Sequence, residues 1–372
     1  MDPQTVFCHN PACPASGQVG KGNIGVHSLK EQRYICHLCG KTFVETKGTV
    51  FYRLRTAPDV VVLVVTLLAY GCPLQAVVMA FGLDERTVLS LQSRSGRHCQ
   101  RVHDHLVEQP RDLGQVQGDE IRAKIQGGIL WMAMAIQVQT RLWLGGVLST
   151  ARDMNLIVAL MQKVRHSALC RSLLFCVDGC AAYVGAIRKV FREPIRNGEP
   201  GRPPLRPWDG IYIAQVVKQY AHKHVVAVSR RIVQGTQAQI DALLQATQGG
   251  GSINTAYIER LNATFRSRIT ALIRRGRALA RQMATLHDTM YLVGTVYNFC
   301  AYHTSLRLPL YLPNGRRRWL RRTPAIAAGI TDHLWTVQEL LSFRVPPPPW
   351  KPPRRRGRPS NALKALVAQW CP

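Results

Sequence analysis

The sequence predicts an α/β fold, a mixed sheet flanked by helices, preceded by a small cysteine-rich module and an all-helical segment. Three observations support this prediction. Residues 112–190 read in the order three strands, helix, strand, helix, which is typical of a mixed sheet covered by helices. Residues 57–99 show only helical patterns, and residues 1–50 contain two close pairs of cysteines. The length of 372 residues allows several domains.

The composition excludes several classes of protein. A hydrophobic fraction of 46% supports a core and excludes a disordered chain. The longest apolar run, Val60 to Ala69, is too short to span a bilayer, and no signal segment opens the chain. We expect a soluble intracellular protein with no membrane partner. The formal net charge of +28 implies a polyanionic partner, with nucleic acid the first candidate and an anionic membrane surface the second.

Two pairs of cysteines define residues 1–50 as the first predicted domain. The first pair has the spacing Cys-x4-Cys, the second has the spacing Cys-x2-Cys-Gly, and strand-like residues flank the second pair. Two such pairs complete the tetrahedral Zn²⁺ site of a zinc ribbon, and a segment this small needs a metal to hold its fold. The alternative is four unrelated thiols. The expected zinc ligands are Cys8, Cys13, Cys36 and Cys39.

Residues 51–105 form the second predicted domain, a helix-turn-helix. Pro58 opens a first helix, Pro73 starts a second, and Asp84 is the expected N-cap of a third. A short turn followed by a helix that bears arginines is the pattern of a DNA-reading helix-turn-helix. The alternative is an ordinary packing unit of three helices. The expected DNA contacts are Arg86 and Arg94.

The α/β region extends over residues 112–305. Its fourth strand, Arg171 to Val177, is almost entirely apolar, as expected of a strand buried on both faces. Asp178 follows directly, at the carboxyl end of the strand, where such sheets bind ligands. The remaining expected strands are 115–123, 128–139 and 141–148, and the expected helices are 154–167, with Asp153 as its N-cap, and 183–190.

An insertion is expected near residues 191–250, because residues 193–209 are rich in Pro, Gly and Arg. Residues 211–218 and 224–228 read as strands, and residues 237–245 read as a short helix, but the strand order stays open. A long helical segment then extends from Ala256 to Tyr302, interrupted near Gly276, and its first half is rich in arginine.

Residues 306–372 form a basic tail rich in proline and arginine. Its Arg-Gly-Arg-Pro element resembles an AT-hook, a basic segment that lies in a narrow A·T minor groove. The alternative is a solvated tail that contacts phosphates without groove specificity. The expected groove contacts are Arg356 and Arg358.

Three acidic residues occupy positions from which they could share a metal site. Asp119 lies on the first strand of the sheet, Asp178 follows the fourth, and Glu259 lies in the first turns of a later helix. Mg²⁺ prefers such oxygen ligands, and phosphoryl transfer on nucleic acids commonly uses two divalent metals. Adjacent strand residues face opposite sides, so only one of Asp119 and Glu120 points at the metals, and periodicity does not choose between them.

Two motifs carry a family resemblance. They are Asp178-Gly-x3-Tyr183 and the helix Tyr-Ile-Glu259-Arg-Leu-Asn with Arg266 further along. Together with Asp119-Glu120 they resemble the RNase H-like DDE transposases of bacterial insertion sequences, and the zinc ribbon and helix-turn-helix are similar to the N-terminal part of that family. The resemblance covers most of residues 1–330 and favours Asp119 over Glu120.

The resemblance implies a mechanism. Asp119 and Asp178 would hold Mg²⁺ or Mn²⁺, and Glu259 would complete the site. Water would cleave DNA at the ends of the element, and the freed 3′-hydroxyl would attack target DNA. Arg266 would hold a phosphate, and Asn262 would orient Glu259 or contact the DNA. Arg260, on the same helix, is a further expected DNA contact.

The implied partners are double-stranded DNA, namely the terminal inverted repeats of the element and its target, and a second copy of the chain at synapsis. The implied location is the bacterial cytoplasm, in association with the nucleoid. Two alternatives remain: a non-catalytic DNA-binding regulator derived from a transposase, and an RNase H-like nuclease that cuts without joining.

Overall fold

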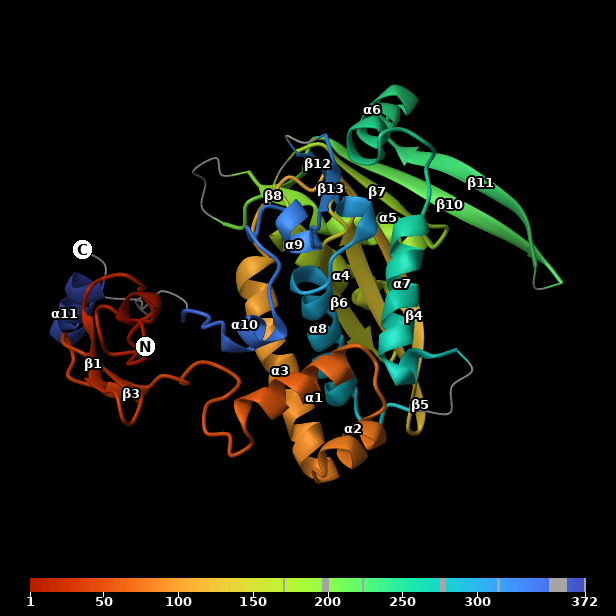
Figure 1. Cartoon of the computed structure of the whole chain (residues 1–372). Helices are drawn as coiled ribbons and strands as arrows, with labels where there is room; N and C mark the ends of the chain where they lie inside the picture. The colour runs from red at the N-terminus through yellow and green to blue at the C-terminus, as the bar shows by residue number, and fades with distance from the viewer. Residues whose placement is uncertain are drawn as a thin grey trace. The chain divides into compact units, whose positions relative to one another are not determined.

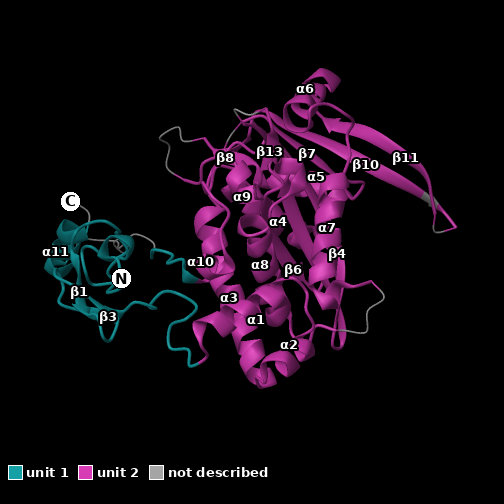
Figure 2. Ribbon diagram, viewed as in Figure 1, with its two compact units in different colours: residues 1–55, 342–372 teal, residues 56–341 magenta. Residues whose placement is uncertain are grey.

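The computed structural model describes residues 1–169, 171–195, 201–222, 224–274, 279–312, 315–347 and 360–370. The chain divides into two compact units (Figure 2). Unit 1 comprises Met1–Arg55 and Ser342–Pro372, and unit 2 comprises Thr56–Leu341.

Unit 1 is built on a small antiparallel sheet of three strands. The sheet has the order β1 (Ile24–Ser28), β2 (Arg33–Cys36), β3 (Thr42–Val44). Its small core surrounds four cysteines and includes the buried side chains of Tyr34 and Phe43. A short helix, η1 (Pro3–Thr5), precedes the sheet, and α11 (Asn361–Trp370) belongs to the C-terminal part of the unit.

Three helices open unit 2, and their boundaries follow from local sequence signals. They are α1 (Pro58–Ala69), α2 (Leu74–Phe81) and α3 (Glu85–Leu106). Gly82 ends α2 with a left-handed φ of 61°, which glycine adopts without a steric penalty. The Asp84 carboxylate accepts hydrogen bonds from the amides of Arg86 and Thr87, which confirms the predicted N-cap.

The third helix packs along α8 (Met283–Phe299). At their crossing, a Cβ on Gly96 would lie 2.2 Å from the carbonyl oxygen of Asp288, so only glycine permits this close approach. Ser93 donates a hydrogen bond of 2.7 Å to the Asp288 carboxylate. One face of α3 is therefore buried along its length, while Arg86, Ser90, Arg97 and Arg101 are exposed.

A mixed sheet of six strands forms the centre of unit 2 (Figure 1). Its order is β11-β10-β7-β4-β5-β6. The central strand β7 runs parallel to both of its neighbours, and every other pair is antiparallel. The strands are β4 (Gln115–Ile125), β5 (Gly128–Gln137), β6 (Trp143–Ser149), β7 (Leu173–Asp178), β10 (Ile211–Ala221) and β11 (His224–Gln234). The α/β prediction is confirmed.

Helices flank this sheet on both sides. They are α4 (Met154–His166), which Asp153 caps as predicted, α5 (Ala181–Val190), α6 (Gln237–Gln248) and α7 (Ala256–Arg268). The strand order that the sequence left open is now defined, because β10 lies beside β7 and β11 forms the edge. The helical segment predicted from Ala256 to Tyr302 is two helices, since α7 ends at Arg268 and α8 begins at Met283.

Short elements complete the chain. They are β8 (Arg192–Pro194), β9 (Leu205–Pro207), η2 (Thr270–Leu272), η3 (Thr304–Leu306), β12 (Leu308–Tyr311), β13 (Arg317–Leu320), α9 (Pro324–Ala327) and α10 (Val337–Ser342). Among the described residues, no helix combines the length and the apolarity needed to cross a membrane.

Candidate functional site

A pocket of about 820 Å³ opens at the carboxyl end of β7, beside β4, β10 and α7. This is the end of the sheet at which α/β folds bind ligands. The pocket combines acidic and basic side chains. Its acidic residues are Asp119, Asp178 and Glu259, and its basic residues are Arg152, Lys218, Arg266 and Arg274. All three predicted carboxylates therefore line one pocket, although they come from distant parts of the sequence.

The buried side chain of Gln117 docks α7 onto β4. Its Oε1 atom accepts hydrogen bonds of 3.0 and 3.1 Å from the amides of Tyr257 and Ile258. These amides lie in the first turn of the helix, where no carbonyl of the helix can accept them. Gln117 and Asp119 are two residues apart and share one face of the strand, so the contact that fixes the helix also places Asp119 beside it.

The carboxylate of Asp119 is held by two donors. Its Oδ1 accepts the Glu120 amide at 2.8 Å, and its Oδ2 accepts the Asn262 side chain at 2.7 Å. Burial, together with the nearby carboxylates of Glu120, Asp178 and Glu259, raises the pKa of Asp119 to about 6. A carboxylate crowded by others in this way favours a bound cation.

Asp178 ends the buried strand β7 as predicted. Its Oδ1 accepts the amide of Cys180 at 3.0 Å, and its Oδ2 lies 3.5 Å from the guanidinium of Arg152. Carboxylate oxygens of Asp119, Glu120 and Asp178 lie within 4.8 Å of one another. Asp119 and Asp178 thus share both this cluster and the pocket lining.

Glu259 lines the same pocket but lies outside that cluster of oxygens. Its Oε1 accepts the Lys218 ammonium at 2.6 Å and the Thr255 hydroxyl at 3.0 Å. Burial opposes ionisation of Glu259, but these two contacts outweigh it and lower the pKa of the carboxyl. Glu259 is therefore paired with a lysine from β10.

Glu120 occupies the other face of β4, as strand alternation requires. Its side chain is 1% exposed and accepts hydrogen bonds of 3.2 and 2.8 Å from Nε and Nη2 of Arg152. Tyr183 of α5 packs on the same face, 3.1 Å from where a Cβ on Gly118 would lie. Neither Arg152 nor Lys218 was expected, because nothing in the local sequence relates them to carboxylates that lie 32 and 41 residues away.

The pocket fits a divalent cation of the magnesium type. Such ions take hard oxygen ligands and keep several waters, so two or three carboxylates suffice. Asp119 and Asp178 supply clustered oxygens from neighbouring parallel strands, and Glu259 lies across the pocket. Burial is the main cause of the raised pKa of Asp119, and the neighbouring carboxylates, whose charge a cation would neutralise, add to it.

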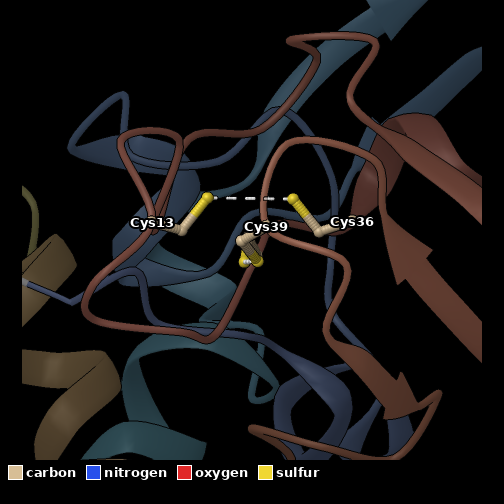
Figure 3. Close-up of side chains that lie close together, drawn as sticks. Cys13, Cys36 and Cys39 are labelled. Carbon is tan, nitrogen blue, oxygen red and sulfur yellow. Dashed lines mark hydrogen bonds between the residues drawn. The ribbon is translucent and has the colours of Figure 1, made fainter.

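The four cysteines of unit 1 lie together, as predicted, and fit Zn²⁺. The sulfur atoms of Cys8 and Cys39 are 3.6 Å apart, and those of Cys13 and Cys36 are 3.8 Å apart. A tetrahedral site with Zn–S bonds of about 2.3 Å places its sulfurs about 3.8 Å apart. All four sulfurs lie within 4.8 Å of one another. Figure 3 shows the Cys13 and Cys36 side chains pointing toward one another, with Cys39 close by.

Surrounding groups donate to these sulfurs. The Asn23 side chain donates to Cys36 at 3.1 Å, and the Asn10 amide donates to Cys8 at 3.4 Å. Burial opposes ionisation of Cys39, but hydrogen bonds from Asn10 and Lys41, and from the other cysteines, outweigh it and lower its pKa to about 7. Donors aimed at sulfur favour the thiolate that a metal requires, whereas burial raises the pKa of the Cys8 and Cys13 thiols.

The expected DNA-contacting residues fall into three groups. Arg266 and Asn262 line the pocket. Arg260 is exposed on α7 outside the pocket lining, and Arg86 and Arg94 lie on α3, exposed and half-buried respectively. Arg356 and Arg358 lie outside the residues that the structure describes.

Comparisons of the sequence with protein-family models and with curated proteins found no match. The acidic pocket and the cysteine cluster are therefore the observations from which a function can be argued.

Proposed function

We propose that this protein is a DNA transposase of the RNase H-like DDE type, which uses divalent metal to cleave DNA at the ends of an element and joins the freed 3′-hydroxyl to target DNA. The observation that carries the proposal is the pocket itself. Asp119 and Asp178, from adjacent parallel strands, share it with Glu259 from a helix, and four cationic side chains surround them.

This mixture of charges suits a phosphodiester substrate. Carboxylates alone would bind metal and repel DNA, whereas cations alone would bind DNA without holding metal. Arg266 and Arg274 line the pocket next to the carboxylates, and each can pair with phosphate oxygens. The net charge of +28 indicates that the rest of the chain also favours binding of a polyanion.

Each residue of the pocket would have a separate role in binding metal or DNA. Asp119 and Asp178 supply hard oxygen ligands, and Asn262 fixes the orientation of Asp119. A pair of divalent ions bound there supplies charge stabilisation at the attacking and leaving oxygens. Glu259 would turn from Lys218 toward the metals. Arg266 holds the DNA strand in register for in-line attack.

The other modules would recognise the DNA. A zinc ribbon on the four cysteines, the exposed Arg86 of α3, and the basic tail would bind the terminal inverted repeats and the target. Synapsis of two ends would require at least a dimer. The bacterial nucleoid, in the cytoplasm, is the expected location.

The test is a strand-transfer assay on an oligonucleotide that carries the inverted repeat flanking the gene, incubated with target plasmid and Mg²⁺ or Mn²⁺. The expected result is metal-dependent joining that Asp178→Asn abolishes. Cleavage without joining would replace the proposal with a nuclease. Binding of the repeat with neither reaction would replace it with a DNA-binding regulator.

A further inference from the structure

We infer that Glu120 is a positioning residue, which fixes the guanidinium of Arg152 at the floor of the pocket as a phosphate-binding group, and that Glu120 is not itself a metal ligand. This inference rests on the proposed function. It gives a role to Glu120, which strand periodicity could not distinguish from Asp119 as a metal ligand, and to Arg152, which the sequence did not single out.

Glu120 differs from the two aspartates in its exposure, although carboxylate oxygens of all three lie within 4.8 Å of one another. Its carboxylate is 1% exposed and does not line the pocket, whereas Asp119 and Asp178 do. Its Oε2 is occupied by two N–H groups of Arg152. Its other oxygen, Oε1, is also buried. Because Arg152 occupies Oε2 and the side chain is buried, Glu120 is less accessible to an ion in the cavity than Asp119 and Asp178.

A buried carboxylate also requires a charged partner. Removing an ionised group from water is costly unless a counter-charge and hydrogen bonds compensate. Arg152 is the cation that contacts Glu120, at 2.8 Å. Burial, together with the nearby carboxylates of Glu120, Asp119 and Asp178, raises the pKa of the Tyr183 hydroxyl, and Arg152 is the counter-charge that contacts Glu120.

Arg152 connects this buried charge to the pocket. Its side chain is 43% exposed and lines the cavity, its Nη2 lies 3.5 Å from Asp178, and it stacks 5.2 Å from the ring centroid of Trp131. Glu120 engages Nε and Nη2, while Nη1 donates no hydrogen bond within the described residues. Glu120 therefore pairs with one edge of the Arg152 guanidinium, and the remaining N–H groups are available to a ligand in the cavity.

A guanidinium held in this way is organised before its ligand arrives. Arginine loses rotamer freedom when it binds phosphate, and the pair with Glu120 and the Trp131 ring has already removed much of that freedom. Its place beside Asp178 sets the phosphate next to the carboxylate predicted to hold metal. A lysine could not replace Arg152, because its single ammonium group cannot pair with Glu120 and also present a second set of N–H groups to a phosphate.

The experiment is a double-mutant cycle in the full-length, zinc-loaded chain, with the variants Glu120→Gln, Arg152→Met and the two combined. Arg152→Met leaves a buried carboxylate unpaired and is expected to lower the melting temperature. The double variant removes both charges and is expected to recover stability. If Arg152 binds phosphate, affinity for a short duplex, measured at raised salt, falls about tenfold in Arg152→Met and stays as low in the double variant.

Glu120→Gln is expected to weaken duplex binding alone but not in the Arg152→Met background, because Glu120 acts through Arg152. Arg122→Met is the matched control. It removes one positive charge from an exposed position on the same strand and should change affinity little. Unchanged duplex affinity in Arg152→Met, or recovery of affinity in the double variant, would overturn the inference.

Mn²⁺ titration followed by electron paramagnetic resonance provides the second readout. Asp178→Asn should weaken Mn²⁺ binding at least about tenfold, whereas Glu120→Gln should leave it near that of the parent. Equal losses in Glu120→Gln and Asp178→Asn would make Glu120 a ligand and overturn the inference. No loss in Asp178→Asn would instead refute the metal site of the proposed function, while the duplex-binding cycle still tests Glu120 and Arg152.

Discussion

Asn262 on α7 donates a hydrogen bond of 2.7 Å from its side-chain amide to Oδ2 of Asp119 on β4, across 143 residues of sequence. Asn262 is 1% exposed, so this contact lies in the buried part of the pocket wall. It joins the strand that carries Asp119 to the helix that carries Glu259. Together with Gln117, which accepts the first amides of the same helix, it fixes the relative position of two predicted metal ligands.

Replacing Asn262 with alanine should destabilise the protein. The substitution leaves the half-buried carboxylate of Asp119 without its side-chain donor, and loss of such a hydrogen bond lowers the free energy of unfolding by about 1–3 kcal/mol. Urea unfolding measures this loss. Ser267→Ala, at an exposed position on the same helix, is the control and should have little effect. Equal stabilities of the two variants would contradict the role given to Asn262.

The stability of the protein should depend on the protonation of Asp119. Its pKa is raised from the ordinary value of 3.8 to about 6, chiefly by burial. Between these values the folded state keeps a proton that the unfolded state has lost, so the contribution of Asp119 is largest below pH 3.8 and declines as the pH rises through 6.

Asp119→Asn removes this titration. Without Mg²⁺ or Mn²⁺, the variant should exceed the parent in unfolding free energy at pH 7 by on the order of 2 kcal/mol, and the difference should shrink toward pH 4. Chemical unfolding across this range, with Asp153→Asn at a helix cap as the comparison, measures the effect. A parent that is more stable than the variant at pH 7 would show that Asp119 is not crowded by negative charge.

Unit 1 should depend on zinc. Each chain is expected to bind one Zn²⁺ on Cys8, Cys13, Cys36 and Cys39, because their sulfur spacing matches a tetrahedral site. Cys36→Ser should lower the zinc content and expose unit 1 to proteolysis, since its small sheet has little other core. Cys72→Ser, at a half-buried cysteine of unit 2, should retain the metal. Full zinc content in Cys36→Ser would exclude this ligand set.

Glu259→Gln should reduce metal-dependent activity without reducing the stability of the protein. Its ion pair with Lys218 is partly exposed, with side-chain exposures of 48% and 35%, and such pairs contribute at most about 1 kcal/mol. The melting temperature should therefore change little, whereas metal-dependent DNA processing should fall strongly. Lys218→Met, which breaks the same pair from the other side, should retain metal binding. A variant Glu259→Gln that is as active as the parent would remove Glu259 from the proposed site.

Much of this architecture could be predicted because local signals set it. Pro58, Asp84 and Asp153 fixed helix starts, and the apolar run before Asp178 identified the buried central strand. Alternation on β4 required Asp119 and Glu120 to face opposite sides but did not say which faced the pocket. That depends on Gln117, whose partners lie on a helix about 140 residues away, and on Asn262 of that helix, which donates to Asp119.

The basic side chains of the pocket could not be predicted for a related reason. Arg152 and Lys218 reach the carboxylates only because a turn before α4 and the strand β10 meet β4 and α7 in three dimensions. Nothing within a few residues of either cation marks it as different from the many other arginines and lysines of a chain with a net charge of +28.

The measurement that tests the central claim most directly is strand transfer of a terminal-repeat oligonucleotide into plasmid DNA, by the parent and by Asp178→Asn, with Mg²⁺ or Mn²⁺. The account predicts joined products that require the metal and that the variant does not form, although the variant still binds the oligonucleotide. Joining by Asp178→Asn at the rate of the parent would contradict it.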